Sequence, residues 1–121
     1  MHRFHFPKTH RLVAGGDFQR VYRAGRRLHG NGFTLIILPN TLPWNRLGIS
    51  VQRKTGSAVR RNRIKRLIRE TFRLNRELFP AASDIVVTVR PGFALDSLAE
   101  VRTAMARLLE PMRTDGRRDA G

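Results

Sequence analysis

The sequence predicts an α+β fold in one small domain, with elements in the order helix, strand, strand, helix, strand, helix. Its 121 residues are the size of one domain, and 40% of them are hydrophobic. Apolar residues recur at helical spacing in three segments and at strand spacing in three others. We place one folded domain at residues 1–112, including a basic arm over 1–10, and expect a disordered tail over 113–121, where Gly, Arg and Asp dominate.

The first half of the chain predicts one short helix and two strands. Asp17 can cap a helix over residues 18–23, and Gly25 is placed to end it. Residues 33–38 are apolar and rich in strand formers, and residues 47–51 alternate between large apolar and small side chains. Because only a short loop separates these two strands, we expect them to pair as a hairpin.

The second half predicts a long helix, a central strand and a final helix. Ser57 precedes a helical pattern over residues 58–79, which Pro80 ends. Residues 84–89 contain a continuous apolar run, which indicates a strand at the centre of the sheet. Residues 95–109 carry one apolar stripe at helical spacing, made of Leu95, Leu98, Val101, Met105, Leu108 and Leu109.

Basic residues greatly outnumber acidic ones. The chain has 24 Lys and Arg against 9 Asp and Glu, for a formal net charge of +15. Like charge at this density opposes a compact state unless an anion relieves it, and nucleic acid is the usual partner. Most of the cations are Arg, whose flat fork of donors fits phosphate and stacks on bases. A GC-rich genome would also raise the Arg content, but it would not explain the net charge.

Several classes of protein do not fit this composition. The chain has no cysteine, which excludes disulfides and thiolate metal sites and suits a reducing compartment. Its longest apolar stretch, residues 35–38, is far shorter than the roughly 18 residues of a membrane span. Residues 1–10 lack the apolar region of a signal peptide. We therefore expect a cytoplasmic protein that binds no membrane.

The long helix has an apolar side and a cationic side. Ile64, Leu67, Ile68 and Phe72 cluster on the side expected to pack on the sheet, and Glu70 is the only acid between Arg53 and Arg76. A solvated helix face usually carries both positive and negative side chains. Two oppositely charged pairs are available here, Arg66 with Glu70 and Arg73 with Glu77. The cations outnumber these acids, so the excess needs a partner from outside.

The start of this helix strengthens that interpretation. Three arginines lie in or near the first turn, where the helix dipole disfavours each cation by roughly 0.3–1 kcal/mol. A bound polyanion would relieve this cost and could also use the free backbone N–H groups. We interpret the cationic side, where Asn62, Lys65, Arg66, Arg69, Arg73 and Arg76 gather, as a nucleic-acid-binding face rather than a solvated one. With the first turn included, the candidate RNA-binding residues are Arg60, Arg61, Asn62, Arg63, Lys65, Arg66 and Arg69.

Three aromatic residues could stack on unpaired bases, as in proteins that bind single-stranded RNA. Phe18 and Tyr22 share one face of the short first helix, and Phe33 opens the first predicted strand. Each of the three could instead be a core residue. Val21 could supply the core contact of the first helix and leave Phe18 and Tyr22 partly exposed. No helix-turn-helix or zinc module that would favour DNA is evident.

Several motifs of this sequence occur together in one known protein family. The most specific is Arg61-Asn62-Arg63-Ile64-Lys65-Arg66-Leu67-Ile68-Arg69-Glu70, preceded by Gly56 and Ala58-Val59 and followed by Phe72-Arg73. The strand Leu47-Gly48-Ile49-Ser50-Val51 with Lys54 shortly after it also agrees, as does Arg90-Pro91 after the third strand. Together these motifs resemble the bacterial ribonuclease P protein component over about residues 8 to 110, which implies that the domain at residues 1–112 is an RNA-binding domain of this type.

This resemblance implies a fold and a function. In the family, helices pack on a mixed sheet with a left-handed strand-helix-strand crossover, an exception to the usual handedness. The protein joins a catalytic RNA that removes the 5′ leader from precursor tRNA. The RNA binds the catalytic Mg²⁺, and the protein supplies no catalytic residue, cofactor or metal site. No obligate protein partner is implied.

The resemblance also implies roles for individual residues. The face from Arg60 to Arg69 would contact the catalytic RNA. A cleft for the single-stranded leader would be lined by Phe18, Tyr22, Phe33, Arg53 and Lys54. Ile36 departs from the pattern, because some members have an aromatic residue there.

Two other hypotheses remain open at this stage. The chain could be a nuclease that acts alone, although its acids are scattered and Asp96 with Glu100, a close pair, lies off the apolar stripe. It could also be a structural or ribosome-associated RNA-binding protein. The histidines His2, His5 and His10 are best interpreted as weakly basic RNA contacts on the arm.

Overall fold

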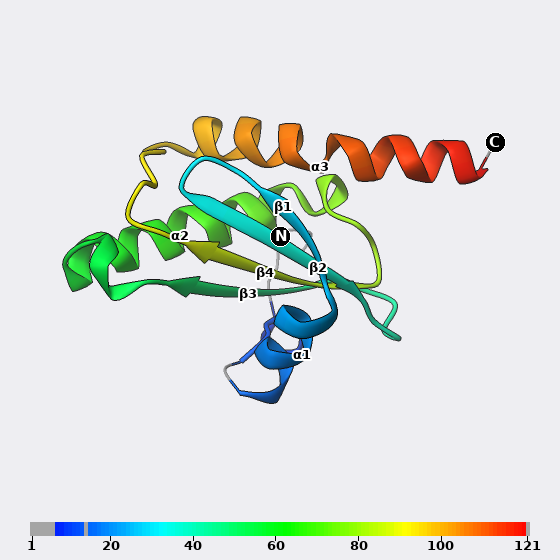
Figure 1. The fold of residues 1–121 in the computed structure, drawn as a ribbon, viewed down its shortest axis with the longest axis horizontal. Coiled ribbons are helices and arrows are strands. Elements are labelled where there is room, and N and C mark those ends of the chain that lie inside the picture. Colours follow the sequence, from blue (N-terminus) through cyan, green and yellow to red (C-terminus); the bar gives the residue numbers. More distant parts are fainter. Residues whose placement is uncertain (1–6, 14, 121) are drawn as a thin grey trace.

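A computed structural model describes residues 7–13 and 15–120, with side chains up to Met112 (Figure 1). The α+β architecture predicted from the sequence is confirmed. Along the chain the elements are the 3-10 turn η1 (Lys8–His10), α1 (Gly16–Ala24), β1 (Arg26–His29), β2 (Phe33–Pro39), β3 (Arg46–Val51), the 3-10 turn η2 (Arg53–Thr55), α2 (Ala58–Leu74), the 3-10 turn η3 (Arg76–Leu78), β4 (Ser83–Val89) and α3 (Leu98–Ala120).

The four strands form one mixed sheet in the order β1-β2-β4-β3. Strand β4 is antiparallel to β2 and parallel to β3, so it is the buried central strand that its apolar run predicted. The predicted hairpin between β2 and β3 is wrong, because β4 lies between them. Strand β1 was not predicted; it pairs with β2 and forms the edge of the sheet. Helix α2 connects the parallel neighbours β3 and β4, which is the strand-helix-strand crossover expected from the resemblance.

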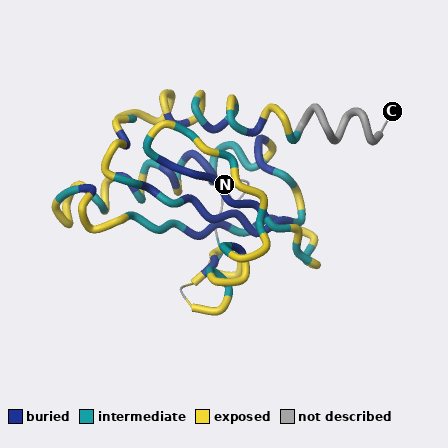
Figure 2. Tube along the Cα trace, viewed as in Figure 1, coloured by how far each residue is buried: buried dark blue, intermediate teal, exposed yellow. Residues whose placement is uncertain are grey.

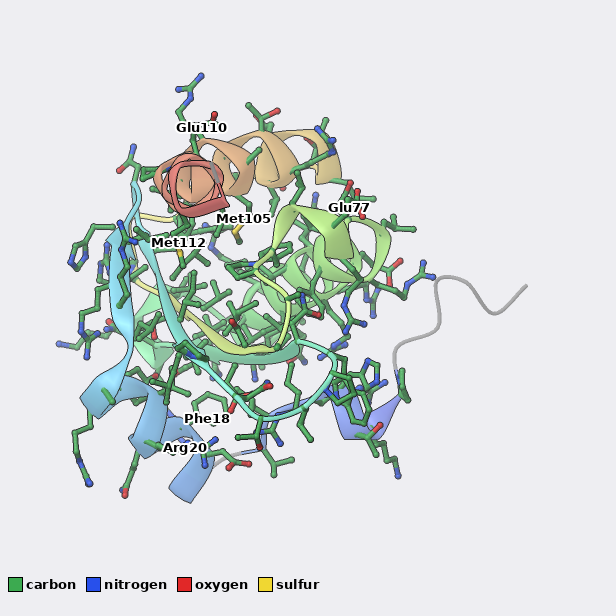
Figure 3. All side chains as sticks on the ribbon, turned by 90° about the vertical axis from the view of Figure 1, so that its right-hand side faces the viewer. Phe18, Arg20, Glu77, Met105, Glu110 and Met112 are labelled. Atoms are coloured by element: carbon green, nitrogen blue, oxygen red, sulfur yellow. The ribbon has the colours of Figure 1, made fainter. Side chains whose placement is uncertain are left out.

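Helices cover both faces of the sheet (Figures 1 and 2). Helices α2 and α3 lie on one face, over a core that includes Leu35, Ile37, Ile68 and Phe72. Helix α1 lies on the other face, over a smaller core that includes Ile36 and Val21. We call this second side the α1 face. Figure 3 shows Phe18 and Arg20 on α1 and Met105 on α3, on opposite sides of the sheet.

The ends of α2 follow local capping chemistry. Ser57 begins the helix as predicted, since its hydroxyl accepts a hydrogen bond from the backbone N–H of Arg60 at 3.1 Å. The helix ends at Leu74, earlier than the predicted residue 79, and Asn75 leads into the separate turn η3.

The last helix also differs from its predicted bounds. It begins at Leu98 rather than residue 95, because Ser97 caps it by accepting from the N–H of Glu100 at 3.1 Å. The Glu100 carboxylate accepts in return from the N–H of Asp96 at 2.8 Å, an arrangement similar to a capping box but reaching one residue before the N-cap. The helix extends to Ala120, past the predicted domain boundary at residue 112 and through Pro111, and the disorder predicted for residues 113–121 stays a prediction. In the part of the chain that the structure describes, no helix is long and apolar enough to cross a membrane.

Candidate nucleic-acid interface

Positive charge is concentrated in one continuous part of the chain. The sequence contains no Asp or Glu between Asp17 and Glu70, a stretch that includes nearly all of α1, the strands β1 to β3 and most of α2. The remaining acids belong mainly to the end of α2, to β4 and to α3. The cations of the acid-free stretch therefore have few neutralising partners of their own.

Helix α2 presents its cations to solvent, as the sequence predicted. Ile64 and Ile68 are buried against the sheet, whereas Arg66 and Arg69 are exposed and Lys65 is half-buried. Among the described residues the structure shows no hydrogen-bond or ion-pair partner for these three cations. They form, with the exposed amide of Asn62, a surface that we call the α2 ridge, defined by Asn62, Lys65, Arg66 and Arg69.

Glu70 does not neutralise this ridge. Its carboxylate accepts two hydrogen bonds from Arg73, at 3.0 and 2.7 Å, rather than pairing with Arg66 as the sequence allowed. These hydrogen bonds hold the pKa of Glu70 below its usual range, against the opposing effect of partial burial. Arg66 is consequently left with its charge directed outward.

The arginines of the first turn contact the protein itself. Arg60 donates to the Phe93 carbonyl at 2.8 Å and to the Thr55 carbonyl at 3.2 Å, so it links η2 to the loop before α3. Arg61 donates to the Gly56 carbonyl at 3.2 Å. Arg63 forms an exposed ion pair with Asp96 at 2.7 Å. These contacts fix the start of α2, and the roles of the three arginines in RNA binding stay predictions.

On the α1 face, Val21 supplies the core contact of the helix and the two aromatic residues are partly exposed, which is the second of the alternatives that the sequence allowed. Val21 is fully buried and supplies the core contact of the helix, whereas Phe18 and Tyr22 are half-buried with ring centroids 6.3 Å apart. The Phe18 ring lies over Gly48 of β3, where a Cβ atom would come within 2.7 Å of Phe18 Cζ. The Tyr22 hydroxyl shares a hydrogen bond with Thr88 Oγ1 at 3.1 Å.

The prediction that Phe33 lines the same surface is wrong. Its side chain is 2% exposed and packs edge-on against Phe93, with ring centroids 5.9 Å apart. Side chains alternate along a strand, so Phe33 points with Leu35 into the core under α2 and α3, away from α1. Ile36 does point to the α1 face but is completely buried beneath the helix, so it offers no exposed surface for stacking.

A row of hydroxyl groups crosses the α1 face beside Tyr22. Thr34, Thr88 and Ser50 are register partners on β2, β4 and β3, so they lie side by side across three strands. Turn η2 follows β3 directly and exposes both Arg53 and Lys54. The sequence alone could not reveal this row, because its members come from three strands whose pairing order is not local.

A buried carboxylate attaches α1 to this face. Asp84 of β4 accepts hydrogen bonds from Arg46 at 2.8 and 2.7 Å, from Arg20 of α1 at 2.7 Å and from Asn40 at 2.9 Å. Burial alone would raise the pKa of Asp84, but the donors from Arg46 and Asn40 and the nearby positive charges outweigh it, and the pKa is lowered. The position of Phe18 and Tyr22 thus depends on a charge cluster that holds Arg20, which lies between them on the same helix.

The described part of the predicted N-terminal arm packs on the protein. The N–H of Leu12 donates to the Leu47 carbonyl at 2.8 Å, and the His10 ring stacks on Trp44 with centroids 4.8 Å apart. His2 and His5 lie outside the described residues. In the described ranges, no group of three or more His, Cys, Asp or Glu residues is placed to hold a metal ion.

Comparison with known proteins identifies the family. The family model for ribonuclease P matches residues 6–113. The chain belongs to the ribonuclease P protein family. It is 56% identical over 108 residues to the ribonuclease P protein component of Desulfotalea psychrophila, covering 89% of this chain and 90% of that protein. It is 46% identical over 114 residues to the ribonuclease P protein component of Syntrophobacter fumaroxidans, covering 93% of each.

Solved structures of the family share this fold. The RNase P protein of Staphylococcus aureus matches with a TM-score of 0.76 at 33% identity, covering 87% of this chain and 96% of that one. The RNase P protein of Thermotoga maritima matches with a TM-score of 0.75 at 36% identity, covering 84% and 96%. The resemblance recognised from the Arg-Asn-Arg helix is therefore confirmed, and so is the mixed-sheet fold that it implied for ribonuclease P proteins.

Proposed function

We propose that this protein is the RNA-binding subunit of ribonuclease P, which assists a catalytic RNA in removing the 5′ leader from precursor tRNA. The observation that carries the proposal is the α2 ridge, whose cations Lys65, Arg66 and Arg69 have no hydrogen-bond or ion-pair partner among the described residues. Folded RNA supplies the phosphates that such a ridge requires, and each neutralised phosphate releases counterions. Family membership supports the assignment of this RNA as the ribozyme.

The α1 face is the proposed site for the leader. Phe18 and Tyr22 present half-buried rings, which can stack on bases of a single strand without sequence preference. Arg53 and Lys54 provide exposed cations beyond the hydroxyl row, where phosphates of the same strand can bind. The leader would thus lie between an aromatic helix and a basic turn, away from the α2 ridge that holds the catalytic RNA.

The chemistry of cleavage belongs to the RNA in this proposal. The catalytic Mg²⁺ ions are bound by the RNA subunit, and the protein acts by screening phosphates and extending the substrate site. The place of action is the cytoplasm, where precursor tRNA is made in bacteria. No obligate protein partner and no membrane are needed.

Reconstitution tests the proposal directly. Adding the protein to a family-matched catalytic RNA is expected to lower the Mg²⁺ concentration needed for leader removal, and the protein alone is expected to leave precursor tRNA intact. Cleavage by the protein without RNA would favour a nuclease that acts alone. A catalytic RNA whose Mg²⁺ requirement stays unchanged would favour a structural or ribosome-associated role instead.

A variant of Phe18 tests the leader site separately. Phe18→Ala is expected to weaken binding of precursor tRNA to the holoenzyme by about 1–3 kcal/mol, the value of one stacked base, and to leave binding of mature tRNA unchanged. Equal losses for precursor and mature tRNA would show that Phe18 only supports the fold.

A further inference from the structure

The edge strand β1 carries two basic side chains on the α1 face. Arg27 and His29 are register partners of Ile36 and Thr34, so they point to the same side of the sheet as α1 and the hydroxyl row. Both residues are exposed. They lie in the acid-free stretch of the chain, and the nearest acids in the sequence are Asp17 and Glu70. Arg27 therefore adds positive charge to the α1 face at the edge opposite η2, and His29 adds a polar ring beside it.

Arg27 is held against the proposed stacking site. Its Nη2 donates to the Tyr22 carbonyl at 2.7 Å, and its guanidinium carbon lies 6.0 Å from the centroid of the Tyr22 ring. A guanidinium has five N–H donors, so this contact leaves several free. The side chain is thus ordered beside an aromatic ring while its charge faces solvent, which is how arginine can bind a phosphate next to a stacked base.

His29 lies beside the hydroxyl row and reaches solvent. The Arg90 guanidinium can only donate, and its Nη1 lies 2.6 Å from Thr34 Oγ1, so the threonine oxygen accepts from it. His29 Nδ1 lies 3.2 Å from the same oxygen of the buried Thr34. This contact orients the exposed imidazole at the sheet edge, where its other ring nitrogen is available to a phosphate or a base.

The geometry gives a path across the sheet. Turn η2 follows β3 at one edge, and β1 is the opposite edge, so three strand spacings, about 14 Å in total, separate them. The hydroxyl row crosses this distance, with Tyr22 beside it. A single strand that enters over Arg53 and Lys54 and stacks on the aromatic residues reaches Arg27 and His29 as it leaves. The path runs away from α2, which adjoins β3.

We propose that Arg27 and His29 bind the distal part of the single-stranded leader and so set the leader length at which affinity stops increasing. The inference rests on the proposed function, because it extends the leader site from the α1 face to the edge strand. Two residues on one strand face lie about 6–7 Å apart, which allows each to contact a separate phosphate.

A leader-length series with the reconstituted holoenzyme tests this inference. Precursor tRNAs whose leaders grow one nucleotide at a time are titrated against the wild type and against the Arg27→Ala/His29→Ala double variant. We expect equal affinities for short leaders. For long leaders we expect the variant to stop gaining affinity earlier, to bind about fivefold more weakly and to show a log–log salt slope lower by about 0.7, from the lost phosphate contact of Arg27.

Further variants separate the possible causes. Arg107→Ala removes an exposed arginine from α3 on the other face of the sheet and should match the wild type at every leader length. Arg27→Lys should restore most of the salt slope, and His29→Ala alone should reduce the gain for long leaders without touching the Tyr22 contact.

The outcomes distinguish this inference from the proposed function. Superimposable length profiles for the double variant and the wild type would overturn the β1 path. A loss at all leader lengths would also overturn it, because Arg27 would then act only by supporting Tyr22. A wild-type holoenzyme whose affinity does not depend on the leader at all would contradict the leader site itself.

Discussion

Asp84→Asn is expected to lower the free energy of unfolding by about 3–5 kcal/mol, the cost of removing one partner from a buried ion pair. The Asp84 side chain is only 1% exposed, and Arg46, its principal partner, is 20% exposed. The substitution keeps the shape but leaves a largely buried guanidinium without its counter-charge. Urea unfolding of the wild type and of Asp84→Asn measures this difference in the free energy of unfolding, and equal m-values for the two proteins are expected.

Asp96→Asn is the matched control for this prediction. Asp96 pairs with Arg63 at the same 2.7 Å distance, but the two side chains are 74% and 61% exposed. Solvent screening reduces such a pair to about 0–1 kcal/mol. If Asp84→Asn cost no more than Asp96→Asn, the Asp84 cluster would not be what attaches α1 to the sheet.

The same residue predicts how stability depends on pH. The pKa of Asp84 is lower in the folded protein than its ordinary value of about 3.9 in an unfolded chain. The stabilisation it provides is therefore complete above that ordinary value and is lost as the pH falls through the folded pKa. Below about pH 4, the wild type should lose stability more steeply than Asp84→Asn, as measured by urea midpoints over an acid series.

Removing two cations of the α2 ridge is expected to have the largest effect on assembly with the catalytic RNA. Arg66→Gln/Arg69→Gln keeps long side chains with good helix propensity but removes two phosphate-binding charges. The log–log dependence of affinity on salt should become less steep by about 0.7–0.9 per lost contact, with a corresponding loss of affinity at low salt. Filter binding or fluorescence titration across a salt series measures both quantities.

A second double variant separates the change in salt dependence at the ridge from a change that follows only from the lower net charge. Arg102→Gln/Arg107→Gln removes two cations from α3 and should leave the salt slope close to that of the wild type. The ridge variant should also unfold at the same or higher urea concentration, because Lys65 and Arg69 are like charges one helical turn apart. Two double variants with identical salt slopes would mean that the ridge does not contact RNA.

The parts of the fold set by local patterns could be predicted from the sequence. Ser57 marked the start of α2, and the apolar run Ile85-Val86-Val87 marked the central strand. The parts that depend on long-range pairing could not. Strand β1, with the sequence Arg26-Arg27-Leu28-His29, has almost no apolar pattern, and its pairing with β2 decides its structure. The hairpin prediction failed because β4, more than thirty residues further along the chain, lies between β2 and β3.

The residues of the candidate site also divide into those that local patterns predicted and those whose position depends on strand pairing. Helical spacing alone placed Arg66 and Arg69 on one exposed surface, because that surface belongs to a single helix. Phe33 was assigned to the wrong face, since an apolar strand with two buried faces gives no alternation from which its direction could be inferred. The contribution of Thr34, Arg27 and His29 to the α1 face became visible only with the strand register.

The position of β4 at the centre of the sheet has a consequence for biosynthesis. Both β2 and β3 pair with β4, whose last residue is Val89, so neither can complete its ladder until about three quarters of the chain has been made. The acid-free stretch is entirely synthesised before then, so its cations precede the strand that completes the sheet. Because long-range pairing slows folding, the time during which this protein can be captured by the wrong nucleic acid is expected to be longer than for a chain whose strands pair with their sequence neighbours.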